Sequence, residues 1–343
     1  MIAGTLARLL APGPLSSAEA RQVLEQILEP TDGDVERVAI LVALAGRPLQ
    51  AEELVAFARE LRRRARPFEV PPADRPVDLC GSGGARVPSF NVSTVAAFVV
   101  AAAGVPVVKH GNRSARGPCG SSDLLEALGL PVTASTALAE ATYRRRRIAF
   151  LHAPLYHPTT GAVREARRAI GIPTIFNRLG PLSSPAAVPF QVAGAPDVAV
   201  ARVFAESLPR LGVRRGLSMA SDDGCDEFSP RALTRAWTWT GGRPRRLRIR
   251  PVATLHGTER RGPWGPLPPK RAAGEAERLL HGGLGARRGS VLLTGGAALW
   301  ITGRTGTFRD GVEVARAALD GGGAYDLLQE LRDVARQVSP GAP

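Results

Sequence analysis

The sequence predicts an α/β protein with a small N-terminal helical domain and a larger domain that has a mainly parallel sheet covered by helices. The first seventy of the 343 residues carry helical periodicity without strand alternation. A proline-rich stretch, 66–75, then separates them from the rest of the chain. Beyond it, short apolar strands alternate with helices, which is typical of a parallel sheet.

Three helices are expected in the first domain. Ser17 is placed to cap a helix over 18–28, and Asp34 to cap a helix over 35–44. A third helix begins at Gln50 and continues to Arg64. We therefore expect a helical domain over 1–70 and an α/β domain over 71–343.

The elements of the second domain follow the change in pattern after the prolines. Strands at 236–239 and 247–250 are expected to form an antiparallel addition to the parallel sheet. The other expected strands are 77–80, 105–108, 148–151, 216–220 and 291–293, and the expected helices are 93–103, 123–128, 275–280 and 311–320.

The composition is that of an ordinary globular protein, 44% hydrophobic and 22% charged. No apolar run is long enough for a membrane span, and the N-terminus carries no cleavage signal. The cysteines Cys80, Cys119 and Cys225 show neither zinc spacing nor a paired framework. These features predict a cytoplasmic protein without a membrane partner.

The net charge of +14 raises the question of nucleic-acid binding. Nearly all basic residues are arginines, and the runs at 62–64, 144–147 and 243–250 lack interleaved aromatics that stack on bases. We interpret this charge as a solvated surface, with nucleic-acid binding as the less favoured alternative. Lys109 and Lys270 are the lysines of the chain, so a lysine in a motif suggests a need for a compact ammonium group.

A glycine-rich segment follows the first expected strand. Gly81, Gly83 and Gly84 lie ahead of Asn91-Val-Ser93-Thr94, which is placed to cap the next helix. Successive backbone N–H groups in such a loop, together with a helix N-terminus, bind anions such as phosphate. The spacing fits neither a Walker loop nor a dinucleotide fingerprint. A tight turn followed by an ordinary N-cap is the alternative.

Two further segments follow strands. Lys109-His110-Gly111-Asn112-Arg113 ends a buried strand, at the sheet edge where open α/β sheets bind ligands, and Lys109 suits a phosphate. Asp226 and Glu227 follow another strand, and adjacent carboxylates beside a phosphate loop suit Mg²⁺. For His110 a structural role is the alternative, and for the acidic segment a solvated turn. No nucleophilic constellation is evident.

Taken together, these segments resemble the anthranilate phosphoribosyltransferase family in order and spacing. The family transfers phosphoribosyl from phosphoribosyl pyrophosphate (PRPP) to the amine of anthranilate in tryptophan biosynthesis. The resemblance implies the fold of pyrimidine nucleoside phosphorylases, a helical domain that also takes in helices from about 160–190, and a homodimer formed through that domain. Further matches are Ala153-Pro-Leu-Tyr-His157-Pro158, Arg167 before Ile170-Gly171, and Thr174-Ile-Phe-Asn177-Arg-Leu-Gly180-Pro181.

The resemblance also implies roles for individual residues. Lys109, Asn112 and Arg167 would be catalytic, with Arg167 facing the carboxylate of the aromatic acceptor. Asp226, Glu227 and Ser93 would hold Mg²⁺. The residues implied in substrate binding are Gly81, Gly83, Gly84, Asn91, Ser93, Thr94, Lys109, His110, Asn112, Arg116, His157 and Arg167.

Several positions depart from the family pattern. Ala85 stands where the family has Asp, and the loop after Arg113 carries Arg116 and Pro118 in place of serines. His152 replaces a usual Phe, and Thr160 a usual Met or Tyr. A paralogue that ribosylates a different aromatic acceptor is therefore an alternative to the anthranilate enzyme. A non-catalytic nucleic-acid binder is a second alternative, against which the retained Asp226–Glu227 pair argues.

Overall fold

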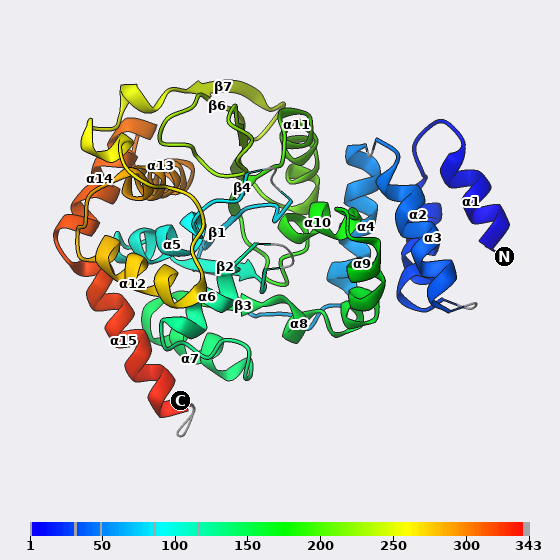
Figure 1. The fold of residues 1–343 in the computed structure, drawn as a ribbon, viewed down its shortest axis with the longest axis horizontal. Coiled ribbons are helices and arrows are strands. Elements are labelled where there is room, and N and C mark those ends of the chain that lie inside the picture. The colour runs from blue at the N-terminus through cyan, green and yellow to red at the C-terminus, as the bar shows by residue number, and fades with distance from the viewer. Residues whose placement is uncertain (1, 31–32, 49, 85–86, 115–116, 339–343) are drawn as a thin grey trace.

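A computed structural model of the chain describes residues 2–30, 33–48, 50–84, 87–114 and 117–338. The N-terminal helices form a separate group at one side of the molecule, and the sheet with its covering helices forms the larger part (Figure 1). In the described part of the chain, no helix is long and apolar enough to cross a membrane.

The predicted N-terminal helices are present, with one further helix before them. The predicted caps Ser17 and Asp34 are instead the first residues of their helices, and Gly33, which has no side chain, precedes Asp34. Ser16, one residue ahead of the predicted cap, accepts a hydrogen bond from the Glu19 backbone, and the Glu19 carboxylate accepts one from the Ser16 backbone. The fully buried Glu53 accepts from Leu15 N (2.8 Å) and pairs with Arg47 (2.6 Å), which ties the last helix to the first loop. The helices are α1 (Ile2–Leu10), α2 (Ser17–Leu28), α3 (Asp34–Ala45) and α4 (Ala51–Arg63).

A segment from the middle of the chain packs against these helices. It contains α8 (Ala153–Tyr156), α9 (Arg164–Ile170) and α10 (Ile175–Leu179). Helix α9 contacts α3, and α10 contacts α3 and α4. Apolar side chains of this segment share one hydrophobic cluster with the N-terminal helices, so chain regions far apart in sequence form a single helical layer (Figure 1).

The sheet has seven strands in the order β3-β2-β1-β4-β5-β6-β7. The first five strands in this order are parallel, and β6 and β7 add to the edge in antiparallel fashion, as the sequence predicts. The strands are β1 (Val77–Cys80), β2 (Val107–Gly111), β3 (Ile148–His152), β4 (Phe190–Gly194), β5 (Arg215–Ser221), β6 (Thr234–Thr240) and β7 (Arg245–Ile249).

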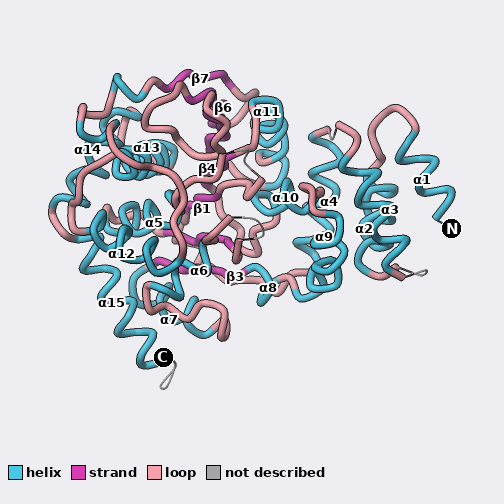
Figure 2. Tube along the Cα trace, viewed as in Figure 1, coloured by secondary structure: helices cyan, strands magenta, loops and turns pink. Residues whose placement is uncertain are grey.

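Helices cover both faces of this sheet (Figure 2). On one face Leu217 and Met219 belong to the same cluster as α5, α13, α14 and α15, and on the other Ala220 joins the cluster of α11 and the N-terminal helices. The covering helices are α5 (Val92–Ala102), α6 (Ser121–Ala127), α7 (Ala137–Arg146), α11 (Val198–Ser207), α12 (Pro269–Leu280), α13 (Ala286–Ile301), α14 (Phe308–Asp320) and α15 (Gly323–Val338).

One predicted strand is wrong, because 291–293 lies inside the helix α13. This helix is buried on nearly all sides, so its apolar run carries no helical periodicity. Gly296 and Gly311 let α14 approach closely, since a Cβ on Gly311 would lie 2.3 Å from the Gly296 carbonyl oxygen. The central strand β4 had no counterpart in the prediction, and it lies between β1 and β5.

The arginine runs have different surroundings. Arg62 is held inside the protein, where Nε donates to Leu182 O and Nη1 to Leu211 O, both at 2.8 Å. The arginines of α7 lie in its last turn, where cations stabilise the helix dipole. Those of β7 are exposed on an edge strand, a placement that discourages strand pairing with another chain.

Candidate functional site

A cavity of about 360 Å³ opens at the carboxyl ends of the parallel strands. Loops after β1, β2, β3 and β5 contribute to its wall, together with α10 and Pro266. The cavity brings together most of the residues singled out in the sequence, namely Gly81, Gly83, Asn91, Ser93, Thr94, Lys109, His110, Asn112, His157, Arg167, Asp226 and Glu227. Among the described residues of that prediction, Gly84 does not line it, and Arg116 and Ala85 lie outside the described residues.

The glycine loop after β1 wraps around the Asp226 carboxylate. Asp226 Oδ2 accepts hydrogen bonds from Ser82 N (2.8 Å), Ser82 Oγ (2.8 Å) and Gly83 N (3.1 Å). Gly83 has a φ of 62°, which glycine adopts without strain. At Gly194, the end of β4, a Cβ would lie 1.7 Å from the Asp226 carbonyl oxygen. The loop and the acidic segment therefore meet only because glycines allow it.

Glu227 performs the corresponding role at the next helix. Its carboxylate accepts from Ser93 N (3.1 Å), Val92 N (3.2 Å) and Ser89 Oγ (3.0 Å), and so caps α5. Burial, and next to it the Asp226 charge, raises the pKa of Glu227 to about 7. The sequence predicts that these backbone N–H groups bind phosphate. In the structure they donate instead to two carboxylates of the chain itself.

The Lys109 side chain is buried between the backbone N–H groups of the glycine loop and those at the N-terminus of α5. Its ammonium donates to Leu79 O and to Ser93 Oγ, the latter at 3.2 Å. Asp78 lies on the neighbouring strand and accepts from His110 N at 3.3 Å. Burial raises the pKa of Asp78 to about 7, against the opposing effect of the Lys109 charge. The cation lies on β2, where Lys109 pairs with Phe150 of β3, and it lines the cavity.

Two neighbouring histidines, His110 and His157, line the cavity. The rings of His110 and His157 have centroids 5.2 Å apart. His157 Nε2 lies 2.9 Å from Ser183 O, and His110 Nδ1 lies 3.4 Å from Gly180 O. Burial, and next to it the His157 side chain, lowers the pKa of His110 to about 3. Burial also lowers the pKa of His157, so both rings are neutral at physiological pH.

Arg167 lies in the last turn of α9 and lines the cavity. Its guanidinium is 5.5 Å from the Phe176 ring centroid, and Nη2 donates to Asn177 Oδ1 at 3.3 Å. The Asn177 amide nitrogen in turn donates to Gly83 O at 3.4 Å. Asn177, Ser82 and Ser89 were not among the predicted site residues, although Asn177 and Ser82 fall within matched motifs. Their contacts with residues distant in sequence are visible only in the folded chain.

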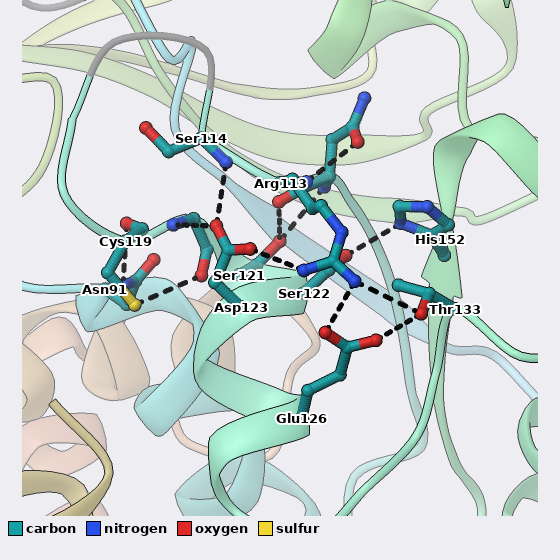
Figure 3. A network of polar contacts seen from close by, with 12 residues as sticks. Asn91, Arg113, Ser114, Cys119, Ser121, Ser122, Asp123, Glu126, Thr133 and His152 are labelled. Atoms are coloured by element: carbon teal, nitrogen blue, oxygen red, sulfur yellow. Dashed lines mark hydrogen bonds and ion pairs between the residues drawn. The ribbon is translucent and has the colours of Figure 1, made fainter. Parts of the chain in front are cut away.

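Asn112 is exposed at the cavity rim, where its side-chain oxygen accepts from Arg113 N at 2.7 Å. The position in which the family has Phe is occupied by the buried His152. Its Nδ1 lies 2.9 Å from Ser122 Oγ (Figure 3). Burial, and next to it the Arg113 charge, lowers the pKa of His152 to about 4. Thr160 Oγ1 donates to His157 O at 2.7 Å, so this departure from the family bonds to a wall residue.

The acidic pair fits Mg²⁺. Each carboxylate is 6% exposed in the cavity wall, and Asp226 Oδ1 accepts no hydrogen bond from the described residues. Ser93 Oγ lies beside them with Lys109 as its donor. In the part of the chain that is described, no three His, Cys, Asp or Glu residues form a metal cluster. Mg²⁺ needs no such cluster, because it commonly binds one or two carboxylates together with substrate phosphates and water.

Comparison with known proteins agrees with this architecture. The chain matches the glycosyl transferase family, helical bundle domain, over residues 4–65, and the glycosyl transferase family, a/b domain, over 73–325. It is 38% identical to an anthranilate phosphoribosyltransferase of Syntrophobacter fumaroxidans over 96% of this chain and 98% of that one. It is 39% identical to anthranilate phosphoribosyltransferase 2 of Streptomyces coelicolor, over 92% and 94%.

Solved structures show the same likeness. Anthranilate phosphoribosyltransferase from Thermus thermophilus superposes with a TM-score of 0.87 at 34% identity, covering 97% of this chain and 99% of that one. The Saccharomyces cerevisiae enzyme in complex with PRPP and Mg, 23% identical with a TM-score of 0.86 over 98% of both chains, shares the fold. The chain belongs to the anthranilate phosphoribosyltransferase family of glycosyltransferases.

Proposed function

We propose that the protein transfers phosphoribosyl from PRPP to the amine of anthranilate, with Mg²⁺, and releases pyrophosphate in tryptophan biosynthesis. The observation that carries this proposal is the meeting, in one cavity, of two backbone donor groups, a buried lysine and an adjacent carboxylate pair. Such a set suits a substrate that brings several phosphates and a divalent cation together. The family of the chain points to the same reaction.

In this proposal PRPP, the phosphoribosyl donor, lies over the glycine loop and the N-terminus of α5. Gly81, Gly83, Asn91, Ser93 and Thr94 would surround its phosphates. Lys109 would add a point charge where negative charge develops on the leaving pyrophosphate. Gly84 and His110 would support this wall from behind the phosphate contacts. Arg116, outside the described residues, is proposed to add a further phosphate contact.

Asp226 and Glu227, with Ser93 nearby, would hold Mg²⁺. When bound, the ion supplies positive charge to the pyrophosphate leaving group. The carboxylates at present accept from the backbone donors of both loops. We therefore propose that the phosphates of PRPP and the two carboxylates compete for the same backbone N–H groups. A divalent cation bound by the carboxylates would relieve this competition.

The acceptor would lie between Arg167, His157 and Asn112. Arg167 offers a planar fork for a carboxylate, and the neutral histidines present little charge to an aromatic ring. An aromatic amine is uncharged at pH 7, so its attack on an oxocarbenium-like ribose needs positioning more than a strong base. The described cavity wall offers no activated nucleophile, and this mechanism requires none.

A paralogue with another aromatic acceptor is the second candidate. It is favoured by the buried His152–Ser122 hydrogen bond and by Thr160 beside His157, since both are polar where the family is apolar. Thr160 lines the cavity and would change the fit of the aromatic ring directly, whereas His152 does not line it and would act through Ser122.

An assay with PRPP, Mg²⁺ and a panel of aromatic amines and acids, followed by pyrophosphate release, tests these proposals. Turnover with anthranilate at least about tenfold better than with the other compounds supports the first, since that ratio corresponds to ~1.4 kcal/mol of discrimination. Preference for another acceptor supports the paralogue, and no turnover with any contradicts both. DNA and RNA binding at low salt that falls steeply with added salt would indicate the nucleic-acid binder instead.

We further propose that the helical domain is made of 1–70 with helices from about 160–190, that 71–343 otherwise forms the substrate domain, and that the protein is a cytoplasmic homodimer. The mixed cluster of α1–α4 with α9 and α10 supports the first point. Exposed Leu10, Val35 and Val42 on the helical layer support pairing through it. Sedimentation of the full chain, with Val35→Asp as the variant, tests the dimer.

A further inference from the structure

In the loop between β2 and α6, the described residues at the two ends touch each other. Asn112 N donates to Ser121 Oγ (3.0 Å), and Ser121 Oγ and Ser122 N lie 3.1 and 3.2 Å from Asn112 O. At Gly120 an added Cβ would lie 2.2 Å from Ser114 N and 2.7 Å from Asn112 O. We call this pair of touching ends, 112–114 and 120–122, the neck of the loop.

Asp123, in the first turn of α6, closes the neck from one side (Figure 3). Its Oδ2 accepts from Ser114 N (3.0 Å) and Gly120 N (2.8 Å), one donor from each end of the neck. Its Oδ1 accepts from Arg113 Nη1 at 2.8 Å. The carboxylate is 17% exposed, and these donors hold its pKa below the ordinary value against the effect of burial. One charged group thus joins three donors of the neck.

Described residues of the loop line the cavity, namely Ser114 of the neck, and Gly117 and Cys119 beyond the neck. Cys119 O accepts from the Asn91 amide nitrogen at 3.0 Å, which ties the loop to the N-terminus of α5. The place of the loop in the cavity is therefore set at two points, by Asp123 at the neck and by Asn91 on the phosphate side.

We propose that Asp123 is a positioning residue, which holds this loop against the phosphate side of the cavity and so sets the affinity for the phosphorylated donor. The inference rests on the proposed function. Asp123 itself does not line the cavity, so it acts through the loop backbone. A loss of the carboxylate removes the acceptor that Ser114 N and Gly120 N share and one of the two points that hold the loop. Asn112 keeps its hydrogen bonds to Ser121 and Ser122, and Arg167 keeps its contact with Asn177.

Glu126 offers a matched control. It lies one turn further along α6 and pairs with the same guanidinium, Arg113 Nη2 to Glu126 Oε2 at 2.6 Å. Its carboxylate also accepts from the Thr133 hydroxyl, away from the loop (Figure 3). Glu126 therefore shares the ion pair with Asp123 but not the contacts with the loop backbone.

The test compares Asp123→Ala, Asp123→Asn and Glu126→Gln. We expect Asp123→Ala to raise the KM for PRPP by about tenfold or more, with kcat and the KM for the aromatic acceptor within about twofold of wild type. Asp123→Asn keeps one acceptor oxygen and should show a smaller rise, and it serves if the alanine variant does not fold. Glu126→Gln should change all constants by less than about twofold.

Hydrogen exchange of the Ser114 and Gly120 amides in the unliganded protein gives a second readout, independent of activity. Both should exchange faster in Asp123→Ala and stay unchanged in Glu126→Gln. Unchanged exchange, an unchanged KM for PRPP, or an equal rise in both KM values would overturn the role of Asp123. A wild-type protein that is inactive with every acceptor, yet shows the faster exchange in the variant, would overturn the proposed reaction and leave the positioning role supported.

Discussion

Two loops on the phosphate side of the cavity are each organised by a carboxylate, but the carboxylates come from different distances along the chain. The glycine loop after β1 folds around Asp226, which lies 144 residues from Ser82. The loop after β2 closes on Asp123, which is three residues from Gly120 and nine from Ser114. The same hydrogen-bonding chemistry is therefore built once by tertiary contact and once locally.

The difference bears on what each loop does when ligand arrives. Asp226 is also a proposed metal ligand, so its bonds to Ser82 and Gly83 occupy donors that a phosphate needs. Asp123 does not line the cavity, and its bonds need not change. On the proposed function, the carboxylate of the first loop competes with the phosphates of the substrate, and the carboxylate of the second loop supports the wall.

The largest effects are expected at the first loop and at Lys109, which lies on β2 and donates to Leu79 O of β1. Lys109→Ala and Asp226→Ala should each lower kcat/KM by about 100-fold or more, because each removes a charge needed where negative charge develops on the pyrophosphate, the lysine directly and the aspartate through the metal. Steady-state kinetics of pyrophosphate release at varied PRPP and Mg²⁺ measures this. Lys270→Ala, which changes the exposed lysine of α12, is the control. Activity near that of wild type in Lys109→Ala or Asp226→Ala would contradict the assignment.

The two loops should respond differently to an added methyl group. Gly194→Ala places a Cβ against the Asp226 backbone within the core, so it should lower the free energy of unfolding by about 3 kcal/mol. Gly120→Ala also crowds a backbone, at Ser114 N, but the surface loop is able to shift, and we expect a loss of about 1 kcal/mol. Urea unfolding measures both, with Gly274→Ala in open space on α12 as control. A larger loss of unfolding free energy in Gly120→Ala than in Gly194→Ala would contradict this comparison of the two loops.

The acceptor side provides a contrast to both loops. Arg167→Ala should raise the KM for a carboxylated acceptor by about tenfold, since it removes a charge-assisted hydrogen bond, and change the KM for PRPP by less than about twofold. Arg167 is linked to the glycine loop through Asn177, so Asn177→Ala separates the two effects. Equal rises in both KM values would mean that the acceptor does not use this arginine.

The smallest expected effect is on the pH dependence of the unfolding free energy, through His152 near the second loop. The folded pKa of His152 is about 4, below the value near 6.5 of an unfolded chain, so the unfolded state binds the proton first as pH falls. The contribution of the neutral ring to stability is complete above pH 6.5 and is lost toward pH 4. In His152→Phe, the loss of unfolding free energy between pH 7 and 5.5 should be up to about 1 kcal/mol smaller than in wild type. Identical pH profiles of the two proteins would refute this.

Much of the chain could be predicted because its signals are local. Ser16 with Glu19, and Gln50 with Glu53, cap helices within four residues, and the strands β1, β2, β3 and β5 end in motifs that stand out in the sequence. Helix α13 could not be predicted, because burial on nearly all sides removes the periodicity that distinguishes a helix from a strand. The place of strand β4 at the centre of the sheet follows only from its pairing with β1 and β5.

The sequence by itself determined the fold class, the presence of the N-terminal helices and the motifs that meet at the carboxyl edge of the sheet, because each depends on neighbouring residues. Tertiary structure alone decided what those motifs bond to. It placed Asp226 and Glu227 on the backbone donors predicted for phosphate, and Asn177 between Arg167 and the glycine loop. These partners are set by strand order and close glycine packing, which join residues far apart in the chain and leave no periodic trace in the sequence.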